Sequence, residues 1–140
     1  MYIIFAILIF GILIAVHELG HFIAAKSLGV KVLEFSIGMG PAIFKKQRGE
    51  TLYALRWLPI GGYCAMEGED EETDDPRAFS RQAAWKRFVV LVAGSAMNFI
   101  FGFLVILLIF AGGTFTPPTV TGFMDGCPYE GETALMAGDT

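Results

Sequence analysis

Two long apolar stretches constrain the fold of this chain more than any other feature. One covers residues 3–28 and is interrupted only by four ionisable side chains, and the other covers residues 88–111 without a formal charge. About 20 apolar residues cross the hydrocarbon core of a bilayer as a helix. Because 54% of the residues are hydrophobic and only 17% are charged, we predict a polytopic α-helical membrane protein with two transmembrane helices. A cleaved signal peptide fits the first stretch poorly, since no basic residue precedes it.

The basic residues predict how these helices are oriented. All ten Lys and Arg residues lie between Lys26 and Arg87, and loops rich in such residues stay in the cytoplasm. We therefore expect residues 29–87 to be cytoplasmic and both ends of the chain to be extracytoplasmic. The confinement of charge to the middle also argues against a nucleic-acid-binding arm, a disordered chain and a coiled coil.

The segment that connects the two stretches is predicted to be rich in β-hairpins. Residues 32–67 hold short β-prone runs that are separated by Gly and Pro, a pattern typical of strands and tight turns. The four expected strands cover residues 32–37, 42–46, 51–58 and 63–67.

Two further parts lead from this segment to the second stretch. Seven of the nine residues from 67 to 75 are acidic, which predicts a solvated loop. Calcium binding is the alternative, but the spaced ligands of an EF-hand loop are missing. Residues 79–87 are predicted to form an interfacial helix, because Trp85 and the neighbouring basic residues suit the cytoplasmic surface of the membrane.

The two histidines of the chain lie in one pentapeptide, His17-Glu18-Leu19-Gly20-His21. Residues four apart lie on one face of a helix, so both imidazoles can bind a single ion with Glu18 beside them. We predict that His17 and His21 are zinc ligands. A catalytic zinc site keeps one position for water, and Glu18 is placed to take the proton of that water as general base.

The location of this motif supports a functional role. Ionisable residues inside an apolar span cost several kcal/mol unless they pair or bind something, and a role in helix packing could be served by Ser or Thr. A His/Glu proton relay remains as the alternative to metal binding.

Beyond the pentapeptide, the chain resembles the bacterial site-2 proteases, the zinc intramembrane metalloproteases that include the regulator of sigma-E protease. The similar segments are EFSIGMGP (residues 34–41), LPIGGY (58–63), DPRAF (75–79), WKRF (85–88) and AGSAMNF (93–99). Their common order covers nearly the whole chain and is more specific than the pentapeptide. The resemblance implies a multi-pass protein of the bacterial inner membrane.

The resemblance also implies how a substrate is held. The β-rich segment would be membrane-associated and would present an exposed edge to an extended substrate near the metal. Glycines in that segment, and an amide in the second span, are the implied substrate-binding residues: Gly38, Gly40, Gly61, Gly62 and Asn98. Each glycine could equally be a plain turn residue, and Asn98 could instead bond across to another helix. The implied substrates are single-pass membrane proteins, such as anti-sigma factors or remnant signal peptides, cut within the bilayer.

We divide the chain into residues 1–111, the N-terminal part of the protease domain, and residues 112–140, a linker and the start of a PDZ-like domain. Gly126-Cys127-Pro128 and Gly138-Asp139 resemble the opening of a PDZ domain, but a complete domain needs several times this length. Since a catalytic zinc normally has three protein ligands, we expect the third beyond residue 140. The 140-residue chain alone should bind zinc weakly and be inactive.

Two rival functions remain open from the sequence. The first is a membrane-embedded metal or proton carrier that uses His17, Glu18 and His21 as a relay. The second is a non-catalytic membrane scaffold, which would tolerate Glu18→Gln without loss of function. A carrier needs no β-edge, so the strands distinguish it from the protease.

Overall fold

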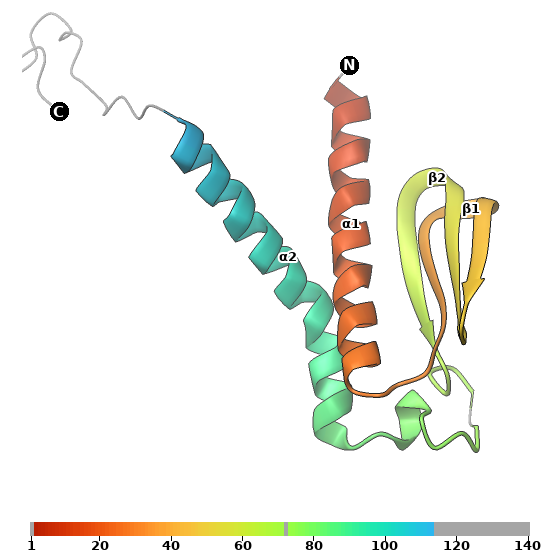
Figure 1. The fold of residues 1–140 in the computed structure, drawn as a ribbon. Coiled ribbons are helices and arrows are strands. Elements are labelled where there is room, and N and C mark those ends of the chain that lie inside the picture. The colour runs from red at the N-terminus through yellow and green to blue at the C-terminus, as the bar shows by residue number, and fades with distance from the viewer. Residues whose placement is uncertain (1, 72, 114–140) are drawn as a thin grey trace, which may run out of the picture. The chain divides into compact units, whose positions relative to one another are not determined.

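The computed structural model describes residues 2–71 and 73–113 of the chain (Figure 1). The elements are α1 (Tyr2–Ser27), β1 (Val32–Arg48), β2 (Thr51–Met66), the 3-10 turn η1 (Phe79–Arg81) and α2 (Ala84–Gly112). Residues Met1–Leu104 form one compact unit and Val105–Thr140 a second. All contacts described below lie within the first unit. The predicted PDZ-like start at residues 126–139 lies outside the described residues.

Both α-helices are long and apolar enough to cross a membrane. α1 has 26 residues with a mean hydropathy of 2.5, and α2 has 29 residues with a mean hydropathy of 2.3. They contain almost all of the two apolar stretches at residues 3–28 and 88–111, with bounds that differ by one to four residues. Side chains along both helices are largely exposed, as lipid-facing surfaces are. The architecture therefore fits a membrane protein.

The prediction of one interfacial helix over residues 79–87 is wrong. The structure has the short turn η1, then an extended residue at Gln82 (φ −74°, ψ 152°), and α2 begins at Ala84. The side-chain amide of Gln82 donates hydrogen bonds to the carbonyl groups of Pro76 (3.0 Å) and Ala78 (3.3 Å). These bonds stabilise a turn at this position, so the chain enters α2 without a continuous helix.

The prediction of four separate strands is wrong at two of its three breaks. The chain turns between β1 and β2 at residues 49–50, within the predicted break at 47–50, but β1 and β2 bend and continue where breaks at 38–41 and 59–62 were expected. The bends contain Gly38, Gly40 and Gly61, whose φ angles are +86°, +85° and +83°. Only glycine adopts such left-handed conformations at little cost. The chain therefore changes direction without leaving the sheet.

Bending places the first part of β1 between two parts of β2. Phe35 pairs with both Cys64 and Tyr53, and Ile37 pairs with both Gly62 and Leu55. The rest of β1 completes an antiparallel hairpin, as in the pair Arg48↔Thr51. Residues 62–66 consequently form an outer edge of this sheet, with no second strand partner among the described residues.

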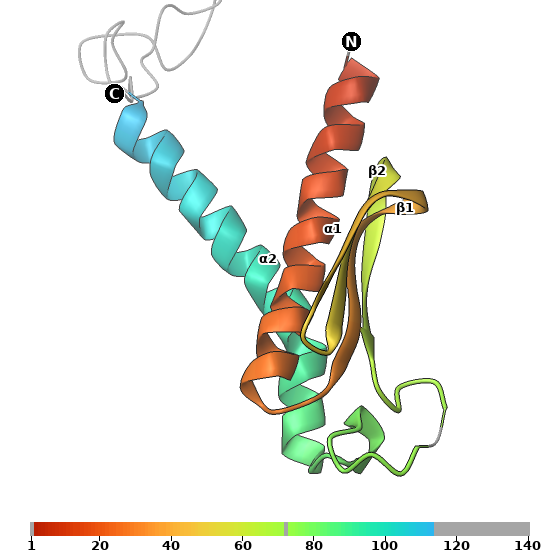
Figure 2. The same ribbon diagram turned by 45° about the vertical axis from the view of Figure 1, so that its right-hand side comes forward.

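The sheet packs along α1, as two views of the ribbon show (Figures 1 and 2). The ring of Phe22 lies 4.9 Å from that of Phe35 and 5.8 Å from that of Tyr53, between ring centroids. Further along α1, a Cβ atom at Gly11 would stand 2.3 Å from the carbonyl oxygen of Pro59. Gly11 lies about 24 Å along the helix axis from Ser27. The bend of β2 therefore packs against α1 well inside the predicted transmembrane segment.

The two helices approach each other closely at a small residue, Gly20. A Cβ atom at Gly20 would stand 2.4 Å from the carbonyl oxygen of Ala93 and 2.9 Å from Cβ of Met97. Small residues let helix backbones come together in this way in membranes. The crossing lies beside His17 and His21, so it decides which residues of α2 face the histidines.

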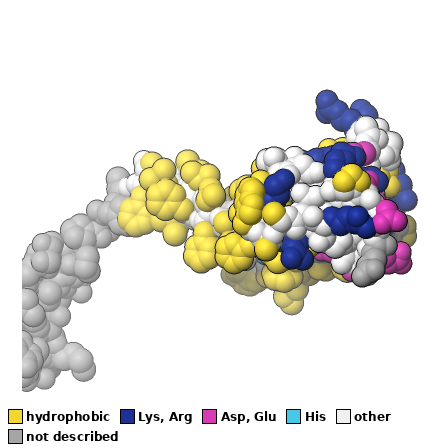
Figure 3. Space-filling model, turned by 90° about the horizontal axis from the view of Figure 1, so that it is seen from below, with side chains coloured by type: hydrophobic (Ala, Val, Ile, Leu, Met, Phe, Trp, Pro, Cys, Tyr) yellow, Lys and Arg dark blue, Asp and Glu magenta, His cyan; other side chains and the backbone are white. Residues whose placement is uncertain are grey.

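At the end of the sheet that lies opposite its bends, ion pairs join segments that are distant in the sequence. Glu50, in the turn between the strands, accepts hydrogen bonds from Lys26 (2.8 Å) and Arg77 (2.7 Å). Lys31 lies 2.9 Å from Asp75 and 3.1 Å from a further carboxylate, that of Glu67. Figure 3 shows the charged side chains gathered on this face. The pairs join the end of α1, the hairpin turn and the acidic loop.

Candidate metal centre

The rings of His17 and His21 converge as the spacing of the pentapeptide predicts. Their Nε2 atoms are 3.1 Å apart, and the ring planes lie at 80° to each other. Two ligands of a tetrahedral zinc, each bonded at 2.0–2.1 Å, stand about 3.3 Å apart. Both Nε2 atoms can therefore bind one ion with little adjustment of the rings.

A backbone carbonyl sets the orientation of the His21 ring. Its Nδ1 lies 2.7 Å from the carbonyl oxygen of Val90 in α2. A carbonyl oxygen only accepts hydrogen bonds, so Nδ1 carries the proton and Nε2 keeps a free lone pair. This is the usual arrangement of a histidine that binds a metal through Nε2.

The space beside the two Nε2 atoms is kept open by Gly94 of α2. A Cβ atom at this position would stand 2.5 Å from Nε2 of His21 and 2.7 Å from Nε2 of His17. An alanine would thus occupy the place that a shared ion needs. Together with the convergence of the rings, this open space shows that the residues present fit a bound zinc ion.

Asn98 lies one helical turn further along α2. Its Nδ2 is 3.4 Å from Nδ1 of His17, and its Oδ1 is buried without a hydrogen-bond partner among the described residues. The two amide atoms are hard to distinguish by shape, so this contact concerns the whole amide group. The structure therefore places Asn98 behind His17, on the side of the ring away from Nε2.

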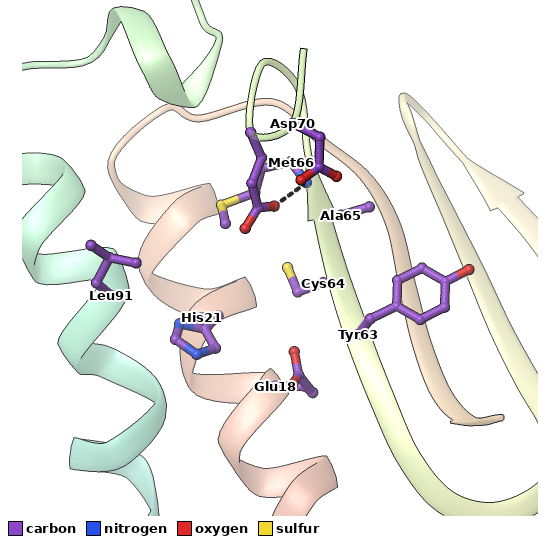
Figure 4. Close-up of a pocket in the computed structure, with 9 residues that line it drawn as sticks. Glu18, His21, Tyr63, Cys64, Ala65, Met66, Asp70 and Leu91 are labelled. Atoms are coloured by element: carbon purple, nitrogen blue, oxygen red, sulfur yellow. Dashed lines mark hydrogen bonds between the residues drawn. The ribbon is translucent and has the colours of Figure 1, made fainter.

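Glu18 faces the outer edge of the sheet. A Cβ atom at Gly62 would stand 3.4 Å from Cγ of Glu18, and the backbone amide of Cys64 lies against the Glu18 carboxylate. Glu18 and His21 line a pocket of about 580 Å³ with edge residues from Tyr63 to Met66 (Figure 4). The predicted base thus lies between the histidines and the outer edge of the sheet.

The four predicted substrate-binding glycines occupy different places. A Cβ atom at Gly62 would lie close to Glu18, whereas Gly38, Gly40 and Gly61 lie in the bends of the sheet. None of the four glycines lines the pocket that holds Glu18. Their positive φ angles and the close carbonyl oxygen of Leu58 at Gly38 (2.5 Å from a Cβ atom) account for glycine at a turn.

The described part of the chain contains no group of three His, Cys, Asp or Glu residues that could hold a metal ion. Two residues of α2 that shape the site were not predicted as site residues, namely Val90 and Gly94. The sequence could have indicated them, because Val90, Gly94 and Asn98 are spaced four residues apart and such residues share one face of a helix.

Comparison with known proteins identifies the family of this chain. The profile of peptidase family M50 matches residues 5–136 of the chain. The chain belongs to peptidase family M50. A relative from Clostridium acetobutylicum is 42% identical over 138 residues, which cover 99% of this chain and 40% of the relative. For a relative from Clostridium perfringens the values are 42% over 139 residues, 99% and 41%.

A third relative, from Thermotoga maritima, is 39% identical over 144 aligned residues, which cover 99% of this chain and 28% of the relative. The names of all three relatives contain the words zinc metalloprotease. The chain thus spans less than half the length of these relatives.

Proposed function

We propose that this M50 chain provides two zinc ligands and the general base of a zinc-dependent intramembrane metalloendopeptidase of the site-2 protease type. The observation that carries the proposal is the geometry of the pentapeptide. The Nε2 atoms of His17 and His21 converge within 3.1 Å, and the neighbouring Glu18 faces the outer edge of the sheet across a pocket.

The residues of the site have separate roles in peptide hydrolysis. His17 and His21 hold zinc, which when bound supplies a Lewis acid that lowers the pKa of water toward about 7. Glu18 accepts the proton of the attacking water and then donates it to the amide nitrogen of the leaving peptide. We expect the third ligand beyond residue 140.

The outer edge of the sheet is the proposed binding place of the substrate. A transmembrane helix hides its amides in internal hydrogen bonds, so it must unwind before cleavage and needs new partners for its backbone. An added strand finds such partners at a sheet edge. In the structure, two amides of this edge face carboxylates and not a strand. The amide of Met66 donates to the Glu69 carboxylate (3.3 Å), and the amide of Cys64 lies against the Glu18 carboxylate.

We propose that Gly62 lets the substrate approach Glu18 and that Gly38, Gly40 and Gly61 act through the shape of the bent strands. The substrates are single-pass membrane proteins, such as anti-sigma factors or remnant signal peptides. The protein is a multi-pass protein of the bacterial inner membrane, with residues 29–87 in the cytoplasm and both ends of this chain outside.

Substitutions in the pentapeptide test this proposal in the full-length protein. Glu18→Gln should abolish cleavage of a membrane substrate, because the amide of Gln cannot accept a proton. Bound zinc should be nearly unchanged, because residue 18 is not a zinc ligand. His17→Ala and His21→Ala should lose both zinc and cleavage. Cleavage by Glu18→Gln at the wild-type rate would exclude the hydrolytic role of Glu18.

A further inference from the structure

We propose that Asn98 is a positioning residue that holds the ring of His17 for zinc by accepting a hydrogen bond from Nδ1–H through its Oδ1. The inference rests on the proposed function, because it takes His17 as a zinc ligand. It assigns Asn98 to the metal centre and not to contact with the substrate.

The first argument is the buried oxygen of Asn98. In the structure Nδ2 faces His17 Nδ1 at 3.4 Å, while Oδ1 is buried and accepts no hydrogen bond from the described residues. A buried acceptor without a partner is destabilising. Turning the amide by 180° exchanges its two atoms, which places Oδ1 beside the ring of His17 and moves Nδ2 to the position that Oδ1 occupied.

The second argument is the chemistry of the ring. When Nε2 of a neutral imidazole binds zinc, Nδ1 carries the proton and can only donate. The Nδ2 group of Asn98 also only donates, so it cannot bond to such a ring. Only the turned amide fits His17 as a zinc ligand, and the same turn gives the buried Oδ1 a donor.

The third argument is that α2 would offer the Nδ1 atom of each histidine an oxygen acceptor. His21 Nδ1 has a carbonyl acceptor, Val90, at 2.7 Å, and the proposed acceptor for His17 is the carbonyl group of the Asn98 amide. Val90, Gly94 and Asn98 follow one another at intervals of four, which places them on one face of the helix.

Two substitutions of Asn98 with opposite hydrogen-bonding capacity test the proposal in the full-length protein. Asn98→Asp keeps the acceptor and removes the donor, while Asn98→Leu keeps the approximate size and removes both. Ser95→Ala is the matched control, because Ser95 is an exposed residue of the same helix. The zinc dissociation constant of each purified variant is measured by competition with a chelator, and the thermal unfolding of the metal-free form checks the fold.

We expect Asn98→Leu to weaken zinc binding by about 10- to 100-fold, as substitutions of hydrogen-bond partners of metal ligands do. Asn98→Asp should bind zinc within a few-fold of the wild type, and Ser95→Ala should be unchanged. In cleavage assays Asn98→Leu should lower kcat at saturating zinc with little change in KM. Near-normal zinc binding by Asn98→Asp is a result that a purely structural role of Asn98 would not produce.

Other outcomes overturn the inference in distinguishable ways. If Asn98→Leu and Asn98→Asp both bind zinc like the wild type while KM rises, Asn98 contacts the substrate and not His17. If Asn98→Leu and Asn98→Asp weaken zinc binding equally, the site depends on the N–H group of the Asn98 amide and not on its oxygen. If His17→Ala leaves the zinc content of the full-length protein unchanged, the proposed function itself fails and the inference fails with it.

Discussion

Gly94 of α2 lies directly beside Nε2 of His21, so that a Cβ atom on this glycine would stand 2.5 Å from the nitrogen. The same Cβ atom would stand 2.7 Å from Nε2 of His17. The second helix therefore closes one side of the metal centre with a residue that has no side chain. This relationship explains how an apolar helix can cover two convergent imidazoles and still leave room for an ion.

Adding one methyl group at Gly94 should destroy the metal centre. We expect Gly94→Ala to weaken zinc binding by about 100-fold or more, at the upper end of the effects seen around metal ligands, and to abolish cleavage. Zinc content of the purified protein measures the first effect. Gly102→Ala is the control, because nothing lies within 4 Å of a Cβ atom there. Equal zinc content in the two variants would contradict the geometry.

Substitution of Gly62 should separate catalysis from metal binding. A Cβ atom at Gly62 would stand 2.8 Å from the carbonyl oxygen of Ser36 and 3.4 Å from Cγ of Glu18, so either the strand edge or Glu18 must shift. A shift of about 1 Å can cost about 100-fold in rate. We expect Gly62→Ala to lower kcat/KM by roughly that factor with normal zinc content. Wild-type cleavage by this variant would show that the edge can shift freely.

The ion pairs of Glu50 predict how stability depends on pH. Hydrogen bonds from Lys26 and Arg77 hold the pKa of the Glu50 carboxyl below its usual value. A lowered folded-state pKa stabilises the fold above the unfolded-state pKa, which is about 4.3 for Glu, and this stabilisation is lost as pH falls through the folded-state pKa. The unfolding temperature should therefore decrease as the pH falls below about 4.3.

The Glu50→Gln variant is the matched control for this pH dependence. It cannot ionise at position 50, so its unfolding temperature should fall less on acidification than that of the wild type. The difference should be a few degrees at most, because partly exposed ion pairs contribute little. Thermal unfolding in detergent between pH 7 and pH 3 measures it. Parallel curves would show that these pairs do not stabilise the fold.

The structure changes how the predicted orientation must be tested. Cys64 is only 8% exposed, and burial raises the pKa of its thiol to about 12, so it should resist thiol reagents on either side of the membrane. Glu71 is exposed in the acidic loop. In a Cys64→Ala background, an impermeant maleimide should label Cys127 in intact cells and Glu71→Cys only after permeabilisation. The reverse labelling pattern would overturn the orientation.

The sequence by itself determined the features that depend on local spacing and on composition. The apolar length of residues 3–28 and 88–111 predicted two helices of spanning length, because helix rise is constant and hydrocarbon excludes unpaired backbone groups. The spacing of four between His17 and His21 predicted their convergence, since the helix repeat alone places them on one face. The β-prone runs predicted strands, although the glycines that suggested breaks turned out to be bends.

Only the tertiary structure decided which distant residues meet the histidines. Val90 is 69 residues from His21, and Asn98 is 81 residues from His17. No local periodicity relates such positions, because the rotation of α2 about its own axis depends on its close packing at Gly20. The edge at Gly62 likewise reaches Glu18 only because the first part of β1 pairs with β2 on both sides. Helix and strand geometry are local properties of the backbone, whereas these contacts arise from the packing of whole elements against one another.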